Sequence, residues 1–366
     1  MITKKIDENS VSLIAEEPDD LFVLRRIIKK EDKITGDTTR AIRQEKEFAR
    51  PDRGERIKIR VILNIEKVSI DDVVDRLKVH GTIIESDSES VQKGSHHSLT
   101  LRIGEPITLT KKKWSDLEKK LIFDKKENFG FLLVAIDTGD CGIGRLSGTH
   151  LKLMPNMYSG ASGKRYKTKF NIETFFEDVQ GAVLSSIREG DMIIIFGPGE
   201  TRKRFSNYLL ETPIGKKYKI QVIEGIDSSG EDGIYTFVKS QAMKQAMAES
   251  KLAKVSRIID EIMTLVNKKS NKFTMGFAET EKANEVGAVE SIIFSDKIFE
   301  KQDEDKVIEF LNQAESKGVE IFSVDSTTDV GLRVSALGGI VSLLRFVPNS
   351  LRLQANPDMV CLVILF

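Results

Sequence analysis

The sequence predicts a multidomain protein of the β and α/β classes, and three observations carry this prediction. A chain of 366 residues exceeds what one hydrophobic core holds, so two or three domains are expected. Apolar and polar residues alternate in the N-terminal third, which is typical of half-exposed antiparallel strands. Farther along, short apolar runs alternate with helical patterns, which is typical of layered α/β domains.

Residues 1–125 carry the alternating pattern. It is clearest over 57–65, where every second residue is Ile, Val or Leu, and it returns over 10–15 and 99–103. Short strands at these intervals predict a small antiparallel β-barrel. A helix around Trp114 is expected to close it.

A loop predicted over 36–54 lies in the most basic part of this domain. Between Arg25 and Arg60 there are thirteen Lys or Arg residues and seven acidic ones, a local surplus of six positive charges. Because the whole chain has no net charge, attraction to nucleic acid has to come from such patches. The alternative is an ordinary solvated loop. The basic side chains of this loop suit contact with a phosphate backbone, and Thr38 and Thr39 are expected to add hydrogen bonds that position it.

Residues 129–254 predict an α/β domain with buried strands over 131–136 and 192–196. Pro198 and Gly199 stop the second strand, and a helix follows, capped by Glu200 or Thr201. Arg202, Lys203 and Arg204 then oppose the helix dipole, at a cost of roughly 0.3 kcal/mol each. Such a cost suggests that they face a partner, with a solvated helix face as the alternative.

A second basic stretch precedes the helix predicted over 172–187. From Cys141 to Ile172 there are six basic residues and no acidic one. The glycine-rich loop over 159–169 lacks both GxxxxGK[ST] and GxGxxG, so no nucleotide site is predicted there. An RNA-facing loop or a solvated loop remains. Its candidate RNA-binding residues are Lys164, Arg165, Lys167 and Lys169.

Residues 255–346 predict a compact α/β/α domain of parallel type. A helix over 255–267 is followed by strands over 289–295, 319–324 and 340–346 with helices between them. Residues 347–366 do not continue this pattern, and their apolar end MVCLVILF receives no functional prediction.

Composition predicts a soluble cytoplasmic protein. The two cysteines, Cys141 and Cys361, are far apart and have no histidine at ligand spacing, which argues against a disulfide framework or a structural zinc site. The N-terminus is charged, unlike a signal peptide, and no apolar run approaches the roughly 18 residues of a membrane span.

Several motifs in one order then carry a resemblance. GDTTRAIRQ, FGPGETRKRFSNYL, EKANEVGAVESIIFSDKIF and LGGIVSLLRF together resemble the Pelota/Dom34 family of ribosome-rescue proteins, relatives of the class-one release factors. The resemblance implies an Sm-like barrel, a central α/β domain like that of release factors, and a C-terminal domain similar to ribosomal protein L30e.

The resemblance also implies roles for named residues. The barrel loop with Thr38, Thr39, Arg40 and Arg43 would enter the mRNA path of the small subunit. Pro198 and Gly199 match the turn that meets a GTPase of the elongation factor one alpha type, with Arg202 and Arg204 beside it. Two departures are Glu200, where the family usually has an aromatic residue, and Met275 before Gly276, where Tyr-Gly is common.

Release factors carry Gly-Gly-Gln on the loop that corresponds to 159–169, and this chain lacks that tripeptide. A device for placing a water on the peptidyl ester is therefore missing. The resemblance implies a monomeric factor without a firm cofactor that binds the mRNA and rRNA of a stalled ribosome. It would promote subunit dissociation, mRNA surveillance and decay together with the GTPase and a recycling ABC-type ATPase.

Two alternatives stay open. An endoribonuclease activity dependent on a divalent metal has been proposed for the family, and it would need clustered carboxylates. The candidates are Asp7, Glu8, Asp19 and Asp20. The other alternative is an RNA-binding module that acts outside the ribosome and binds free stem-loops without the GTPase.

Overall fold

The computed structural model describes residues 1–42, 55–70, 76–88, 91–123, 130–160, 171–326 and 328–348. The chain divides into two compact units. The first contains residues 1–126 and 299–318, and the second contains residues 127–298 and 319–366. Across the described ranges, every helix is too short or too polar to cross a bilayer.

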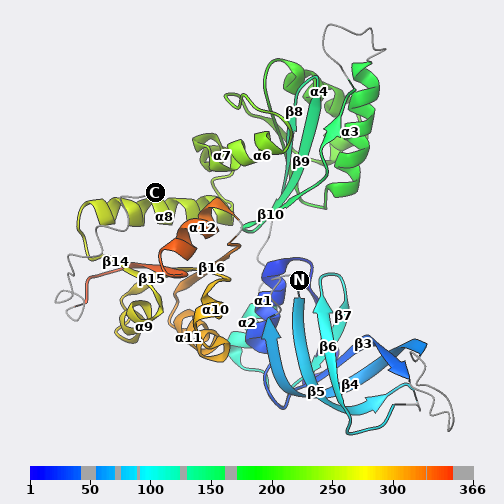
Figure 1. Ribbon diagram of the computed structural model, residues 1–366, viewed down its shortest axis with the longest axis vertical. Coiled ribbons are helices and arrows are strands. Elements are labelled where there is room, and N and C mark those ends of the chain that lie inside the picture. The colour runs from blue at the N-terminus through cyan, green and yellow to red at the C-terminus, as the bar shows by residue number, and fades with distance from the viewer. Residues whose placement is uncertain are drawn as a thin grey trace, which may run out of the picture. The chain divides into compact units, whose positions relative to one another are not determined.

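A seven-stranded antiparallel sheet makes up most of the first unit (Figure 1). Its order is β1-β2-β7-β3-β4-β5-β6, and each neighbouring pair is antiparallel. The inward residues Val61, Leu63 and Ile65 are fully buried, which confirms the predicted antiparallel β architecture. The strands are β1 (Ile2–Lys5), β2 (Ser10–Ile14), β3 (Lys33–Ile42), β4 (Glu55–Ile70), β5 (Arg76–Ser86), β6 (His96–Arg102) and β7 (Pro106–Thr110).

The loop predicted from residue 36 is partly wrong, because β3 continues to Ile42 and pairs with β4 over its whole length. Thr38, Thr39 and Arg40 therefore lie in a strand. Gly36, the first residue of the predicted loop, lies inside β3 against Leu99, where an added Cβ would come within 2.8 Å of Leu99 Cδ2. Close packing accounts for this glycine, whereas a turn was expected.

Two helices accompany the sheet, α1 (Pro18–Ile27) and α2 (Asp116–Phe123). The sequence did not predict α1, because charged residues dilute its apolar pattern. Its start is capped by Asp20, whose Oδ2 accepts hydrogen bonds from the N–H groups of Glu16 and Glu17 at 2.9 and 3.2 Å. Trp114 lies just before α2, and its indole donates to the carbonyl of Asn9 at 2.9 Å.

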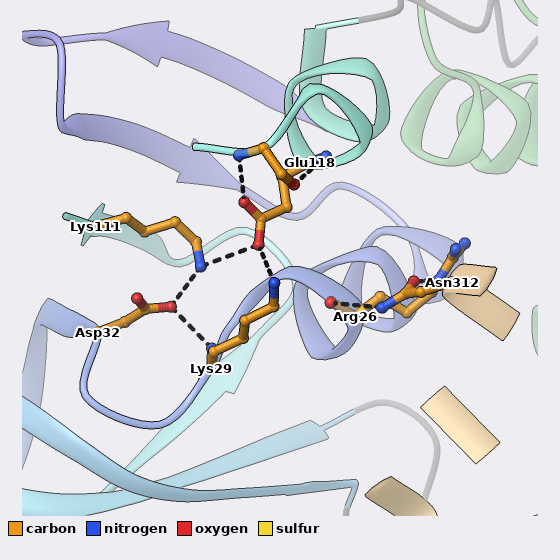
Figure 2. Close-up of polar contacts among 7 residues, drawn as sticks. Arg26, Lys29, Asp32, Lys111, Glu118 and Asn312 are labelled. Carbon is orange, nitrogen blue, oxygen red and sulfur yellow. Dashed lines mark hydrogen bonds and ion pairs between the residues drawn. The ribbon is translucent and has the colours of Figure 1, made fainter. Parts of the chain in front are cut away.

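A network of charges, buried except for the exposed Lys29, ties α2 to the sheet (Figure 2). Lys111 Nζ lies 2.5 Å from Asp32 Oδ2 and 3.3 Å from Glu118 Oε1. Lys29 Nζ lies 2.9 Å from the same Glu118 oxygen. Burial opposes ionisation of Glu118, but hydrogen bonds from Lys29 and the Ser115 N–H, with the charge of Lys111, outweigh it and lower its pKa. The network is structural because each charge has a partner.

Helix α11 (Glu304–Ser316) belongs to the same unit and meets the last turn of α1. Arg25 Nε donates to Glu304, and its Nη2 lies 2.6 Å from Asp305 Oδ1. Arg26 Nε donates to Asn312 Oδ1 at 2.8 Å, and its Nη2 lies 2.6 Å from a Glu315 oxygen. Both arginine side chains are buried, with 5% of Arg25 and 4% of Arg26 exposed.

The central sheet of the second unit is mixed and follows the order β10-β9-β8-β12-β13, with β11 beside β9. β12 is parallel to β8 and β13, while β9 is antiparallel to β8. Both predicted buried strands are confirmed. The strands are β8 (Phe131–Ile136), β9 (Asp140–Ser147), β10 (His150–Leu153), β11 (Met157–Tyr158), β12 (Met192–Phe196) and β13 (Ile220–Val222).

β9 begins at Asp140, shortly after β8 ends at Ile136. Gly142 lies where the backbone of Gly230 approaches the sheet, and an added Cβ would be 2.3 Å from the Gly230 carbonyl. The glycine is needed for close packing.

Helices cover both faces of this sheet (Figure 1). Leu132 and Ile193 pack in the apolar cluster formed with α3 and α4, while Leu133 and Ile194 pack in the cluster that contains α6. This division follows from the period-two geometry of strands buried on both faces. The helices are α3 (Ile172–Ser186), α4 (Thr201–Glu211), α5 (Pro213–Lys217), α6 (Gly230–Lys239) and α7 (Gln241–Ala246).

The last domain holds a four-stranded sheet in the order β14-β17-β15-β16. Only β15 and β16 are parallel, so the predicted parallel type is wrong. All five residues of β17 are buried, and such a strand has the same pattern in either direction. The elements are α8 (Lys251–Asn267), β14 (Phe273–Met275), α9 (Phe277–Glu285), β15 (Val289–Ser295), α10 (Ile298–Lys301), β16 (Glu320–Val324), α12 (Asp329–Ala336) and β17 (Ile340–Leu344). Residues 349–366, most of the predicted extension, lie outside the described residues.

Candidate functional site

The turn of Pro198 and Gly199 joins the carboxyl end of β12 to α4, and we call it the Pro-Gly turn. Gly197 before it has φ 134° and Gly199 has φ 65°, in the left-handed region that favours glycine. At Gly197 an added Cβ would also lie 2.3 Å from the carbonyl oxygen of Ile136. Both glycines are therefore required by the backbone path, and the turn has one defined shape.

The side chain of Arg202 binds the main chain of the Pro-Gly turn. Its Nη1 donates to the carbonyl of Gly197 at 2.9 Å and also to the carbonyl of Gly199. Its Nη2 lies 3.5 Å from Glu224 Oε1, and the side chain is only 12% exposed. A guanidinium has several donors in a fixed plane, and those of Arg202 satisfy carbonyls of the turn, while its contact with a partner stays a prediction.

Lys203 is also paired inside the molecule. Its Nζ lies 3.0 Å from Glu224 and 3.5 Å from Glu200. The hydrogen bond to Glu224 raises the pKa of Lys203, and the same bond lowers the pKa of Glu224. Glu200 occupies the N-cap position of α4, but its side chain makes no capping hydrogen bond. Within the described ranges, Arg204 is exposed and makes no ion pair.

The predicted RNA-binding residues of the first unit lie on β3 or beyond it. Thr38 Oγ1 is 3.1 Å from His97 Nε2 of β6, and Thr39 is exposed opposite Lys58 of β4. Arg40 pairs with β4 through its main chain, while its side chain and the whole of Arg43 lie outside the described part of the structure.

The second predicted RNA-binding group also lies outside it, since residues 161–170 are not described. This group consists of Lys164, Arg165, Lys167 and Lys169. Met275 and Gly276, where the family commonly has Tyr-Gly, lie at the end of β14. Gly276 has φ 83° and is the N-cap residue of α9.

Two of the four candidate metal ligands, Asp7 and Asp20, serve local structure. Asp7 Oδ1 accepts hydrogen bonds from the N–H groups of Asn9 and Ser10, both at 2.7 Å. The pKa of Asp7 is lowered, and the hydrogen bond from Asn9 is the main cause. Asp20 caps α1. Among the residues that the structure describes, no group of three or more His, Cys, Asp or Glu side chains is placed to hold a metal ion.

Comparison with known proteins relates this fold to one family. Residues 1–125 match the model of the Pelota N-terminal domain, and residues 252–348 match the model of eRF1 domain 3. The protein pelota homolog of Nitrosopumilus maritimus is 62% identical over 346 residues, covering 94% of this chain and 99% of the relative. That of Cenarchaeum symbiosum is 49% identical over 348 residues, covering 95% and 100%.

The crystal structure of the Thermoplasma acidophilum Pelota protein has a TM-score of 0.61 and 24% identity, and the match covers 95% of this chain and 100% of that one. The fold is thus a three-domain one: an antiparallel N-terminal sheet, a mixed central sheet and a C-terminal α/β domain like eRF1 domain 3. The chain belongs to the Pelota family.

Proposed function

We propose that this chain is a ribosome-rescue factor that recognises stalled ribosomes and promotes subunit dissociation and mRNA surveillance with a translational GTPase. Membership of the Pelota family supports the ribosomal role. The lack of Gly-Gly-Gln in the sequence supports a role in which peptidyl-tRNA is not hydrolysed. The factor binds and acts mechanically.

The observation that carries this proposal is the Pro-Gly turn. Its glycines have φ values that fix the backbone, and Arg202 bonds two of its carbonyls. A turn that is already ordered loses little conformational entropy when a partner docks on it. We propose that the GTPase contacts Pro198 and Gly199 directly, with Arg204 at the rim and Arg202 holding the turn from the inside.

The remaining parts follow the family. The N-terminal sheet acts as an Sm-like barrel in the decoding site and the last domain as an L30e-like module, with boundaries at about residues 125 and 254. The partners are the mRNA and rRNA of a stalled ribosome, the GTPase and a recycling ABC-type ATPase, and the factor works as a cytoplasmic monomer. Endoribonuclease activity is left out of the proposal because Asp7 and Asp20 are engaged in local hydrogen bonds.

The test is subunit splitting from purified stalled ribosomes, followed by light scattering or gradient sedimentation. The wild-type protein with both the GTPase and the ATPase should split the subunits, and leaving out either one should slow the reaction strongly. The peptide should stay attached to tRNA throughout. Splitting at the uncatalysed rate with all factors present, or release of free peptide, would overturn the proposal.

A further inference from the structure

One side of β3 is unpaired over part of its length. β3 pairs with β4 from Lys33 to Ile42, but its pairing with β7 stops at Thr35, opposite Thr108. From Gly36 onward, no other described strand is hydrogen-bonded to that side of β3. Its main-chain N–H and C=O groups there are available to a ligand.

A cleft of about 340 Å³ opens beside this unpaired edge, between β3 and strands β6 and β7. The apolar part of its lining, which we call the floor, is made by Leu99 and Ile107, which are only 2% and 5% exposed as residues, and most of the other lining residues are polar or charged. Three threonines, Thr38, Thr39 and Thr100, also line it, and the Thr38 hydroxyl lies 3.1 Å from His97 Nε2. A small apolar surface beside several hydrogen-bonding groups suits a ligand that is itself largely polar.

Charged side chains of both signs surround the mouth of the cleft. Arg102 Nη1 lies 3.7 Å from Glu105 Oε1, and Arg60 Nε lies 3.7 Å from Asp37 Oδ1. Lys58 is exposed and makes no ion pair with any residue that the structure describes. The two carboxylates disfavour a phosphate inside the cleft, whereas carboxylates accept hydrogen bonds from the amino groups of bases.

We propose that this cleft binds one unpaired nucleoside of a single-stranded RNA. The base lies on the floor of Leu99 and Ile107, and the edge of β3 with the threonine hydroxyls binds the base edge and the ribose. The adjoining phosphate stays outside, near Lys58. This inference rests on the proposed function, since it names the part of the RNA that the first domain holds.

The size and lining of the cleft favour a nucleoside over the other ligand of an unpaired edge, an added peptide strand. About 340 Å³ lies at the lower end of the roughly 300–1,000 Å³ of small-molecule pockets. Such a volume suits one compact group, while a peptide strand needs a long open edge.

Photo-crosslinking with the full-length protein tests the proposal. A single-stranded RNA of about eight nucleotides carrying one 4-thiouridine is bound and irradiated, and the crosslinked peptides are mapped by mass spectrometry. Crosslinks should fall in residues 36–39 or 99–107. Thr39→Val with Thr100→Val should lower capture there roughly tenfold, because each lost hydroxyl bond weakens binding several-fold. Thr82→Val, a strand threonine of the same sheet outside the cleft, is the matched control and should change nothing.

Competition separates a base from a phosphate. Uridine monophosphate should compete with the crosslink at concentrations where inorganic phosphate does not. Crosslinks confined to other segments, full capture by the double variant, or equal competition by phosphate would each overturn the inference. Thermal unfolding of each variant confirms that it is folded. Co-sedimentation of the wild-type protein with stalled ribosomes is run in parallel, since its failure would count against the proposed function, whereas missing cleft crosslinks would count only against the nucleoside site.

Discussion

Two runs of basic residues lie at opposite ends of their helices, and their side chains end in different surroundings. These runs are Arg25–Arg26 and Arg202–Arg204. The first pair ends α1, where positive charge suits the helix dipole, yet both side chains are buried against α11. The second run lies in the first turn of α4, where the helix dipole disfavours positive charge. Its side chains differ, because Arg202 bonds to the Pro-Gly turn whereas Arg204 is exposed.

The comparison teaches that a run of basic residues does not by itself identify a binding surface. What decides exposure is whether oxygen atoms lie within reach of each guanidinium. Arg26 finds Asn312 and Glu315, and Arg202 finds two carbonyls. Each of these arginines is structural, and only an arginine without such partners is left for another molecule.

The largest expected effect is on stability, from Arg26→Ala. Removing this buried guanidinium leaves Glu315 without its partner at 14% exposure, and breaking a buried pair costs about 3 kcal/mol. Burial lowers the pKa of Arg26, with Glu315 acting against it, and an arginine remains charged at any ordinary pH. Unfolding in urea, followed by fluorescence of Trp114, measures the loss.

Arg102→Ala is the control for this prediction. Its guanidinium is 56% exposed and 3.7 Å from Glu105, so its removal should cost no more than about 0.5 kcal/mol. Equal losses for the two variants would show that the contact between α1 and α11 contributes little in solution.

The second effect is on GTPase affinity, and we expect Arg202 and Arg204 of α4 to contribute to it unequally. Arg202→Ala should weaken GTPase binding about tenfold, because charged hydrogen bonds that hold the Pro-Gly turn are lost. Arg204→Ala should weaken it only about twofold, through the association rate and mainly at low salt. Titration calorimetry and stopped-flow measurements give both quantities. If Arg204→Ala had the larger effect, the rim charge would dominate the contact and the shape of the turn would be secondary.

Arg40 and Arg43 form a further basic pair, on and just beyond β3. Arg40→Ala with Arg43→Ala should weaken binding to stalled ribosomes and reduce the slope of log affinity against log salt by about two, since two fewer phosphate contacts release counterions. Binding is measured by co-sedimentation at several salt concentrations. An unchanged slope would place this pair with Arg26, as structural residues.

The smallest expected effect is the pH response of the pair Lys203–Glu224. The pKa of Glu224 is lowered by Lys203, so its contribution is present above the ordinary value of about 4.3 and is lost as pH falls through the lower folded value. Lys203→Met should return the Glu224 pKa toward its ordinary value. Carboxyl NMR titration measures this shift. No change on substitution would show that the exposed pair does not persist in solution.

The sequence alone determined the buried strands and most of the helices. Residues 192–196 and 289–295 form β12 and β15 as predicted, because a short, wholly apolar run has few other stable places in a folded chain. The resemblance to Pelota was likewise present in the motifs, and the matches to family models confirm it.

Only the tertiary structure decided strand direction, the extent of β3 and the fate of the basic runs. These depend on partners that no local pattern contains: Gly36 packs under Leu99, and Arg26 bonds to Asn312, 286 positions away. A charged side chain goes where folding brings acceptors within hydrogen-bonding distance, since a buried charge without them is costly. The sequence shows that such a charge exists, and the fold determines whether it stabilises the protein or remains for a partner.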